Sequence, residues 1–188
     1  MKKAILIALT VLAANTAAVA HAGERSLTVV FAGGGESDTI AITVSSDGRS
    51  YAIDSATPLE VGGNICSHPA EDPNRLVCEA APIAGFEVNA GPGDDTVSLS
   101  HEVPAPATLR GGSGNDKLIG GAVADKLIGG PGDDRLVGRA GDDWLYGGPG
   151  DDRLYGGSGN DLLRGGTGQN AIFGGSGQNA ISARALIR

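Results

Sequence analysis

Nine-residue units that follow one another without a gap make up the second half of the chain. Residues 111–182 contain eight such units, and each has Leu or Ile at its eighth position. In order, they are GGSGNDKLI, GGAVADKLI, GGPGDDRLV, GRAGDDWLY, GGPGDDRLY, GGSGNDLLR, GGTGQNAIF and GGSGQNAIS. A typical unit combines a glycine turn, one acidic residue and one aliphatic residue, which is too little apolar surface for an ordinary hydrophobic core. The repeat therefore indicates a structure that bound metal helps to hold together.

The composition of the chain fits this interpretation. Glycine accounts for 32 of the 188 residues, and aromatic residues make up only 4%. A glycine content this high also occurs in disordered linkers. Random low complexity does not keep an aliphatic residue at one position of successive units, so we expect 111–182 to be an ordered array.

The chain begins with a segment typical of a secretory signal peptide. Two lysines precede an apolar stretch from Ile5 to Ala14, and residues 20–22 form a small-residue cleavage site. The stretch is short for a membrane anchor, the alternative interpretation, so we expect removal of residues 1–22 and a secreted, extracellular, soluble protein. Without the two lysines the formal net charge changes from −8 to −10. This acidity disfavours nucleic acid and anionic membranes as partners, because both favour basic surfaces.

Residues 23–110 differ from the array and are predicted to form an irregular β-rich region. Asp47-Gly48 is a hairpin signal, and two fragments, 33–40 and 90–98, loosely repeat the unit with acids at Asp38 and at Asp94. We therefore expect this region to stack on the N-terminal end of the array. The β-type runs are 27–31, 39–44, 51–53, 76–78, 86–88 and 96–99.

The two cysteines of the chain, Cys66 and Cys78, lie in this region. In an oxidising compartment an even pair at this spacing is most simply one disulfide that closes a short loop. A zinc site made by cysteines alone needs more ligands than two. We therefore predict a disulfide between them.

The pattern G-G-x-G-x-D-x-U-x, where U is a large aliphatic residue, resembles the RTX or haemolysin-type calcium-binding repeat. The resemblance covers 111–182 and implies that six residues of each unit form a calcium-binding turn and three a short strand. It also implies that two units make one coil of a right-handed parallel β-roll. We therefore expect an all-β fold: a β-roll (β-helix) of eight repeats at 111–182, after the β-rich region and before a tail at 183–188. The layout resembles that of secreted bacterial calcium-binding repeat proteins and implies neither toxicity nor proteolysis.

With two units per coil, each turn stacks on the turn two units away, and the residues at position six form two columns. The first edge carries Asp116, Asp134, Asp152 and Asn170, and the second edge carries Asp125, Asp143, Asp161 and Asn179. Glycines at positions one, two and four permit unusual backbone angles and expose carbonyl oxygens, which suit the hard calcium ion as carboxylates do. The glycines expected to contribute are Gly112, Gly114, Gly130, Gly132, Gly148, Gly150, Gly157 and Gly159.

Calcium is expected to make the array fold. Coils stack at about 4.8 Å, and two carboxylates about 5 Å apart repel by roughly 3 kcal/mol at an effective dielectric of 20. A cation between them converts the repulsion into shared coordination, so binding and folding are predicted to be one event, with several ions and roughly four strong sites. The pairs that include Asn170 or Asn179 lose a charge and should bind more weakly. These asparagines either form a neutral cap or are decayed repeats, and the sequence leaves both readings open.

Other positions of the unit carry further expectations. Val123 and Arg139 stand where the pattern has glycine, so we expect a distorted turn around Asp125. The position-five acids Asp133, Asp142 and Asp151 should face solvent, as should Lys117, Lys126, Arg135 and Arg153 at position seven. The position-eight residues should point inward as a ladder: Leu118, Leu127, Leu136, Leu145, Leu154, Leu163, Ile172 and Ile181.

The sequence favours a binding protein over an enzyme. It contains no H-E-x-x-H zinc-protease motif and no G-x-S-x-G nucleophile elbow, and His68 and His101 stand alone without metal-ligand spacing. The leading hypothesis is a non-enzymatic secreted calcium-binding protein whose array folds on calcium. The alternative is an adhesion or matrix component, in which the roll is a calcium-stiffened spacer and 24–110 binds a cell-surface or matrix partner.

Overall fold

The computed structural model describes residues 5–11, 27–32, 37–45, 50–55, 59–60, 66–67, 72–79 and 83–182. These residues form strands and turns, and none of them lies in a helix, so no membrane-spanning helix is found among them. The strands before the array are β1 (Ile5–Val11), β2 (Leu27–Ala32), β3 (Thr39–Val44), β4 (Ser50–Ser55), β5 (Leu59–Glu60), β6 (Cys66–Ser67), β7 (Arg75–Glu79), β8 (Ile83–Pro92), β9 (Thr96–Leu99) and β10 (Ala107–Ser113). Those of the array are β11 (Lys117–Ile119), β12 (Lys126–Ile128), β13 (Arg135–Ala140), β14 (Trp144–Pro149), β15 (Arg153–Ser158), β16 (Leu162–Thr167), β17 (Ala171–Ser176) and β18 (Ala180–Ser182).

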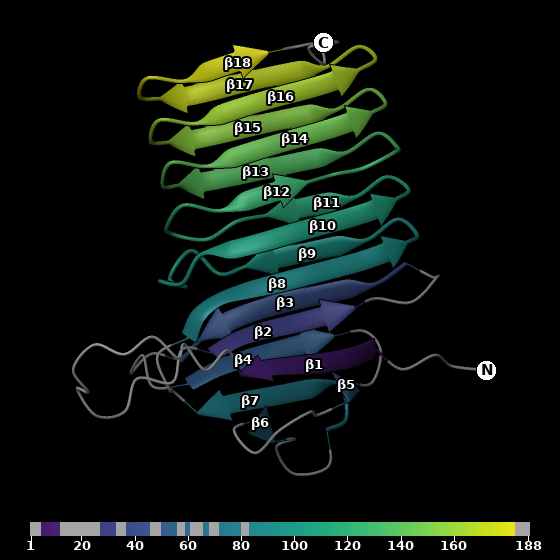
Figure 1. Cartoon of the computed structure of the whole chain (residues 1–188), viewed down its shortest axis with the longest axis vertical. Helices are drawn as coiled ribbons and strands as arrows, with labels where there is room; N and C mark the ends of the chain where they lie inside the picture. Colours follow the sequence, from purple (N-terminus) through teal and green to yellow (C-terminus); the bar gives the residue numbers. More distant parts are fainter. Residues whose placement is uncertain are drawn as a thin grey trace, which may run out of the picture.

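The strands stack into a β-solenoid of about five turns (Figure 1). Sheet A has the strand order β18-β16-β14-β12-β10-β8-β2-β1-β5, and sheet B has the order β17-β15-β13-β11-β9-β3-β4-β7-β6. Consecutive strands of the array alternate between the two sheets, and each pairs in parallel with the strand two further along the chain. Leu118 is thus the partner of Leu136, and Leu127 the partner of Leu145. The expected β-roll with two units per coil is confirmed.

A ladder of aliphatic side chains fills the space between the sheets. Because strand residues alternate in direction, position eight points inward while positions seven and nine point outward. The six position-eight leucines from Leu118 to Leu163 are completely buried, as predicted. The prediction is wrong at the end of the ladder, where Ile172 is only partly buried and Ile181 is 53% exposed. Both belong to the last coil that the structure describes, and no described coil covers it.

The β-rich region continues the roll, as expected. Strands β8 and β2 extend sheet A in parallel, and β9 and β3 extend sheet B, so both sheets run across the predicted boundary at 110/111. The predicted hairpin is present as the antiparallel pair β3 and β4, although residues 46–49 of its turn lie outside the described residues. Buried apolar side chains such as Ile40, Val88 and Val97 extend the ladder upstream.

Several predictions concern segments that the structure describes in part or not at all. In the full chain, Ile5–Val11 forms β1 and pairs antiparallel with β2, while residues 12–26 lie outside the described residues. The signal peptide therefore stays a prediction. The backbone register sets Cys66 opposite Cys78 in β6 and β7, and the disulfide between them stays a prediction. Residues 33–36, His68 and the tail at 183–188 are also outside the described residues.

The outer faces of the sheets pair cations with aromatic rings of the next coil. The Lys126 ammonium lies 3.7 Å from the Trp144 ring centroid, and the Arg135 guanidinium lies 4.6 Å from that of Tyr155. Tyr155 also stacks on Phe173, with 5.1 Å between the ring centroids. These position-seven cations were expected to be simply solvated, and the structure adds a packing contact between coils.

The ladder predicts how strongly individual side chains stabilise the roll. We expect Leu145→Ala, in the middle of the ladder, to lower the free energy of unfolding by about 2–5 kcal/mol, because it leaves a cavity between the sheets. The matched control Ile181→Ala, at the exposed end, should change it by less than about 0.5 kcal/mol. Urea unfolding at saturating calcium measures both values, and equal losses for the two variants would contradict this account of the core.

Candidate metal sites along the two edges

The position-six aspartates tie each turn to the preceding turn on the same edge. One carboxylate oxygen, Oδ1, accepts the backbone N–H of the position-six residue one coil earlier. On the first edge, the Asp116 N–H donates to Asp134 and the Asp134 N–H to Asp152, over 2.8 and 3.0 Å. On the second edge, the Asp125 N–H donates to Asp143 and the Asp143 N–H to Asp161, over 2.8 and 2.9 Å. These bonds join residues 18 positions apart, the length of one coil.

The second oxygen of these carboxylates, Oδ2, is buried without a hydrogen-bond partner. Among the described residues this holds for Asp95, Asp116, Asp134, Asp143, Asp152 and Asp161. A buried ionised carboxylate that lacks a partner costs several kcal/mol, because it has lost its hydration. The edges therefore present a regular series of oxygens that a bound cation would satisfy.

Glycine at position one provides the space in which this oxygen lies. A Cβ placed on Gly129 would overlap Oδ2 of Asp134 and lie 2.8 Å from the carbonyl oxygen of Gly147 in the next coil. The same arrangement recurs at Gly147, which faces Asp152 and the Gly165 carbonyl. Position-one glycines do not have positive φ, so the expectation that they serve unusual backbone angles is wrong. They serve instead to leave an oxygen-lined cradle beside the backbone.

Glycines at positions two and four, except Gly121, do take up the left-handed backbone, as expected. Gly130 and Gly132 have φ of 122° and 138°, values that few residues other than glycine adopt. The carbonyls of the eight predicted ligand glycines each face the equivalent glycine of the next coil, where a Cβ would overlap them. The turns therefore stack with their carbonyl groups directed along the roll. Direct ligation of an ion by these carbonyls stays a prediction.

The burial of the aspartates raises their pKa values. Desolvation is the main cause, and neighbouring carboxylates of the columns add to it. The pKa rises to about 6 for Asp116 and to about 7 for Asp134 and Asp143. The pKa values of Asp125, Asp152 and Asp161 are also raised by burial. Without a cation, the folded roll thus favours protonated carboxyl groups.

The first edge extends further upstream than the predicted site residues. Oδ1 of Asp116 accepts the N–H of Asp95 over 2.8 Å, and Oδ1 of Asp95 accepts the N–H of Asp38 over 2.6 Å. Asp95 is buried, and burial raises its pKa. Asp95, and not Asp94, therefore occupies position six of the upstream fragment. The sequence signal for Asp95 was the match of residues 91–98 to positions two to nine of the unit, in which Asp95 takes position six.

Position-five side chains form a second set of ties that sequence reasoning missed. Asp133, Asp142 and Asp151 are exposed, as expected. However, Asp133 accepts the backbone N–H of Asp151 over 2.8 Å, and Asp142 accepts that of Asn160 over 2.7 Å. Here the side chain receives an N–H from the following coil, opposite to the direction at position six. Asn115 makes the same contact with the Asp133 N–H, so asparagine and aspartate are equivalent at this position.

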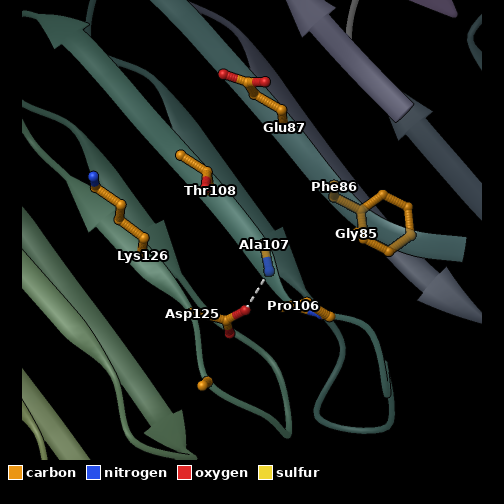
Figure 2. A pocket seen from close by; sticks show the side chains of 9 residues that line it. Gly85, Phe86, Glu87, Pro106, Ala107, Thr108, Asp125 and Lys126 are labelled. Carbon is orange, nitrogen blue, oxygen red and sulfur yellow. Dashed lines mark hydrogen bonds between the residues drawn. The ribbon is translucent and has the colours of Figure 1, made fainter. Parts of the chain in front are cut away.

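The second edge ends upstream at Asp125, where the turn is irregular, as the sequence predicted. Neither Gly121 nor Val123 has a positive φ, and Oδ2 of Asp125 accepts the Gly121 N–H over 2.6 Å. Figure 2 shows Oδ1 of Asp125 bonded to the N–H of Ala107, which stands where other coils have a position-six acid. A hollow of about 380 Å³ lies beside it, lined in part by Glu87, Pro106 and Lys126. No second carboxylate pairs with Asp125 from the upstream side.

At the C-terminal end, asparagines replace the acids but keep the ladder. Oδ1 of Asn170 accepts the Asp152 N–H, and Oδ1 of Asn179 accepts the Asp161 N–H, both over 2.8 Å. The side-chain amide of Asn179 donates to the carbonyl of Gly175 over 3.3 Å. The amide nitrogen thus lies where the other turns have a carboxylate oxygen.

The donor set of both edges fits a hard, oxygen-binding cation such as calcium. Each regular turn offers one buried carboxylate oxygen beside a backbone carbonyl of the next coil. Among the described residues, no three His, Cys, Asp or Glu side chains converge, so an ion on these edges would take backbone carbonyls as ligands. Carboxylate and carbonyl oxygens are the ligands that calcium prefers.

Comparison with known families gives a match over the array. Residues 108–127, 128–163 and 155–185 match the model of the RTX calcium-binding nonapeptide repeat, in four copies. No curated protein and no solved structure matches the chain.

The raised pKa values predict an unusual pH dependence of the metal-free protein. Between about pH 4, the pKa of unfolded aspartate, and pH 7, the folded chain binds protons that the unfolded chain does not. Stability without metal should therefore increase, on the order of a few kcal/mol, as the pH falls from 8 to 5. Saturating calcium should reverse this sign, because the ion requires ionised carboxylates.

The β signal in far-UV circular dichroism, followed in chelator from pH 8 to pH 5, measures this dependence as the fraction of folded chain. The double variant Asp134→Asn with Asp143→Asn keeps both ladder bonds, as Asn170 and Asn179 do, and should flatten the profile. Metal-free stability that is constant or falls on acidification would show that burial does not perturb these carboxylates.

Proposed function

From the match of residues 108–185 to the model of the RTX calcium-binding nonapeptide repeat, we propose that the chain is a secreted calcium-binding protein whose roll folds on calcium. The array carries the binding sites on its two edges. The leucine ladder alone buries a narrow strip of apolar surface, so the free energy of ion binding becomes part of the free energy of folding.

The observation that supports this proposal best is the series of buried carboxylate oxygens without partners. Each lies in the cradle beside a position-one glycine, close to the carbonyl of the next coil. An ion there would bind Oδ2 of one turn and a carbonyl of the next, while Oδ1 keeps its bond to the preceding turn. The residues of this chain hold and orient the oxygens, and the calcium ion supplies the positive charge that stabilises them.

Secretion would carry the array from low calcium inside the cell to high calcium outside it. Extracellular calcium modules work at affinities of about 10⁻⁴–10⁻³ M. The low calcium of the cytoplasm would leave the calcium-dependent turns unfolded and the chain suited to export, and calcium outside the cell would then fold them. The predicted signal peptide and the predicted disulfide between Cys66 and Cys78 are both consistent with an extracellular protein.

The C-terminal asparagines act, in this proposal, as a neutral cap. The ladder bonds to Asn170 and Asn179 need no metal, and the Asn179 amide supplies its own donor to the turn carbonyl. The last coil would otherwise present two carboxylates with no following coil to share an ion.

A calcium titration followed by far-UV circular dichroism tests the main proposal. Purified protein in chelator at pH 7.5 should gain β signal as calcium is added, and magnesium at the same concentration should have a much weaker effect because it dehydrates reluctantly. The variant Asp134→Asn with Asp152→Asn should shift the calcium midpoint upward by roughly tenfold or more, since two buried ligand charges are lost.

The matched control is Asp133→Asn with Asp151→Asn. It removes the same charge one residue away from the position-six acids, at exposed sites where asparagine already occurs, so the midpoint should change by less than about twofold. A β signal that does not respond to calcium, or equal shifts for the two double variants, would refute calcium-driven folding at these sites.

The cap is tested by Asn170→Asp with Asn179→Asp. New carboxylates should raise the number of bound calcium ions, measured by native mass spectrometry, and lower the stability of the protein in chelator. If the ion count and the metal-free stability both stay at the wild-type values, the asparagines are decayed repeats.

A further inference from the structure

Arg139 is built into the second edge in a way that no other position-two residue is. Its guanidinium Nη1 donates to the carbonyl of Gly120 over 3.0 Å and to that of Leu99 over 2.6 Å. These carbonyls belong to two different preceding coils. Arg139 is also the one non-glycine residue with positive φ, 81°, among the residues that the structure describes. A strained backbone with two charge-assisted hydrogen bonds indicates a side chain held in place by its surroundings.

The carbonyl that Arg139 binds has an equivalent in the regular cradles. In those turns, the carbonyl of a position-one glycine, such as Gly147, lies beside the buried oxygen of the preceding aspartate. Gly120 is the position-one glycine of its unit, but the preceding turn has Ala107 in place of the position-six acid. The carboxylate of that turn, Glu102, is exposed and lies 3.7 Å from the His101 imidazole. The positive charge at the Gly120 carbonyl is therefore that of the Arg139 side chain.

The turn at 120–125, which carries Asp125, also differs from the regular turns. Oδ2 of Asp125 accepts the Gly121 N–H, so Asp125 is not among the buried carboxylates that lack a partner. Both oxygens of Asp125 therefore have backbone donors and need no bound metal.

The two departures from the repeat, Val123 and Arg139, are coupled. In regular coils the position-two carbonyl occupies the place of a Cβ on the next position-two residue, as Gly130 does for Gly148. The turn with Val123 lacks the left-handed glycines of the other turns and follows a different course. Arg139 is the position-two residue one coil after this turn, and its side chain reaches back to the carbonyls of Gly120 and Leu99.

We propose that Arg139 is a built-in cation that takes the place of a calcium ion at the upstream end of the second edge. This inference rests on the proposed function, since it assigns one turn of a calcium-binding roll to an internal charge. The turn at 120–125 is consequently held without metal, while the turn at 156–161 on the same edge depends on calcium. The guanidinium suits this role because its planar array of donors can serve carbonyls of two coils at once.

Hydrogen exchange read by mass spectrometry tests the proposal on the full chain, with and without calcium. In the wild-type protein, calcium should slow exchange at 156–161 by roughly tenfold or more beyond its effect at 120–125. Equal calcium-dependent protection of the two turns would overturn the proposal. If exchange at 156–161 does not respond to calcium, calcium-driven folding is refuted. The effect of removing Arg139 is measured in chelator and does not depend on that result.

Two substitutions separate the guanidinium from the backbone strain. Arg139→Gln removes the charge and Arg139→Gly also relieves the positive φ, and in chelator each should accelerate exchange at 120–125 by roughly tenfold, the loss of charge-assisted bonds. The control Arg153→Gln removes an equal charge from an exposed position-seven residue and should leave this turn unchanged. Wild-type exchange at 120–125 in both Arg139 variants would show that the guanidinium does not hold the turn.

Discussion

The roll depends on one hydrogen bond, donated by the backbone N–H of a position-six residue to the carboxylate one coil further along. It sets the register, because the bond joins residues 18 positions apart in every regular coil. It also draws the carboxylate into a space that only a position-one glycine leaves open. The second oxygen is thereby buried without a partner, and the demand for a cation follows from the same contact that positions the turn.

At the ends of the two columns of position-six residues, the chain has groups that do not need a shared cation. A carboxylate that closes a column has no further turn with which to share an ion. At the C-terminal end, the amides of Asn170 and Asn179 keep the ladder bond with no net charge. At the upstream end of the second edge, Asp125 finds both partners among backbone N–H groups. The column thus ends in a neutral amide at one place and in a carboxylate with backbone donors on both oxygens at the other.

Much of the fold could be predicted because the unit has so few ways to bury its leucine and orient its acid. The resemblance to the RTX repeat implied the two sheets and the coil of two units. The inward ladder follows from the aliphatic residue at position eight, and the disturbed turn from Val123 at a glycine position. The sequence could not show that position-one glycines leave space for a carboxylate oxygen and do not adopt a positive φ. Both uses require glycine, so the pattern is the same for each. The position-five ties and the long reach of Arg139 were also missed, since both depend on which coils become neighbours.

Because one coil of 18 residues contains two units, units of odd rank lie on one edge and units of even rank on the other. A residue in a turn can therefore contact only turns of units two, four or more places away. Loss of the one unit between Gly120 and Arg139, residues 129–137, would move the arginine to the opposite edge, away from both of its carbonyls. Loss of two consecutive units, such as 147–164, would keep the position-six ladder, because Asn170 and Asn179 would follow Asp134 and Asp143 on the same edges. The roll can therefore change length only by whole coils without rearranging its edges.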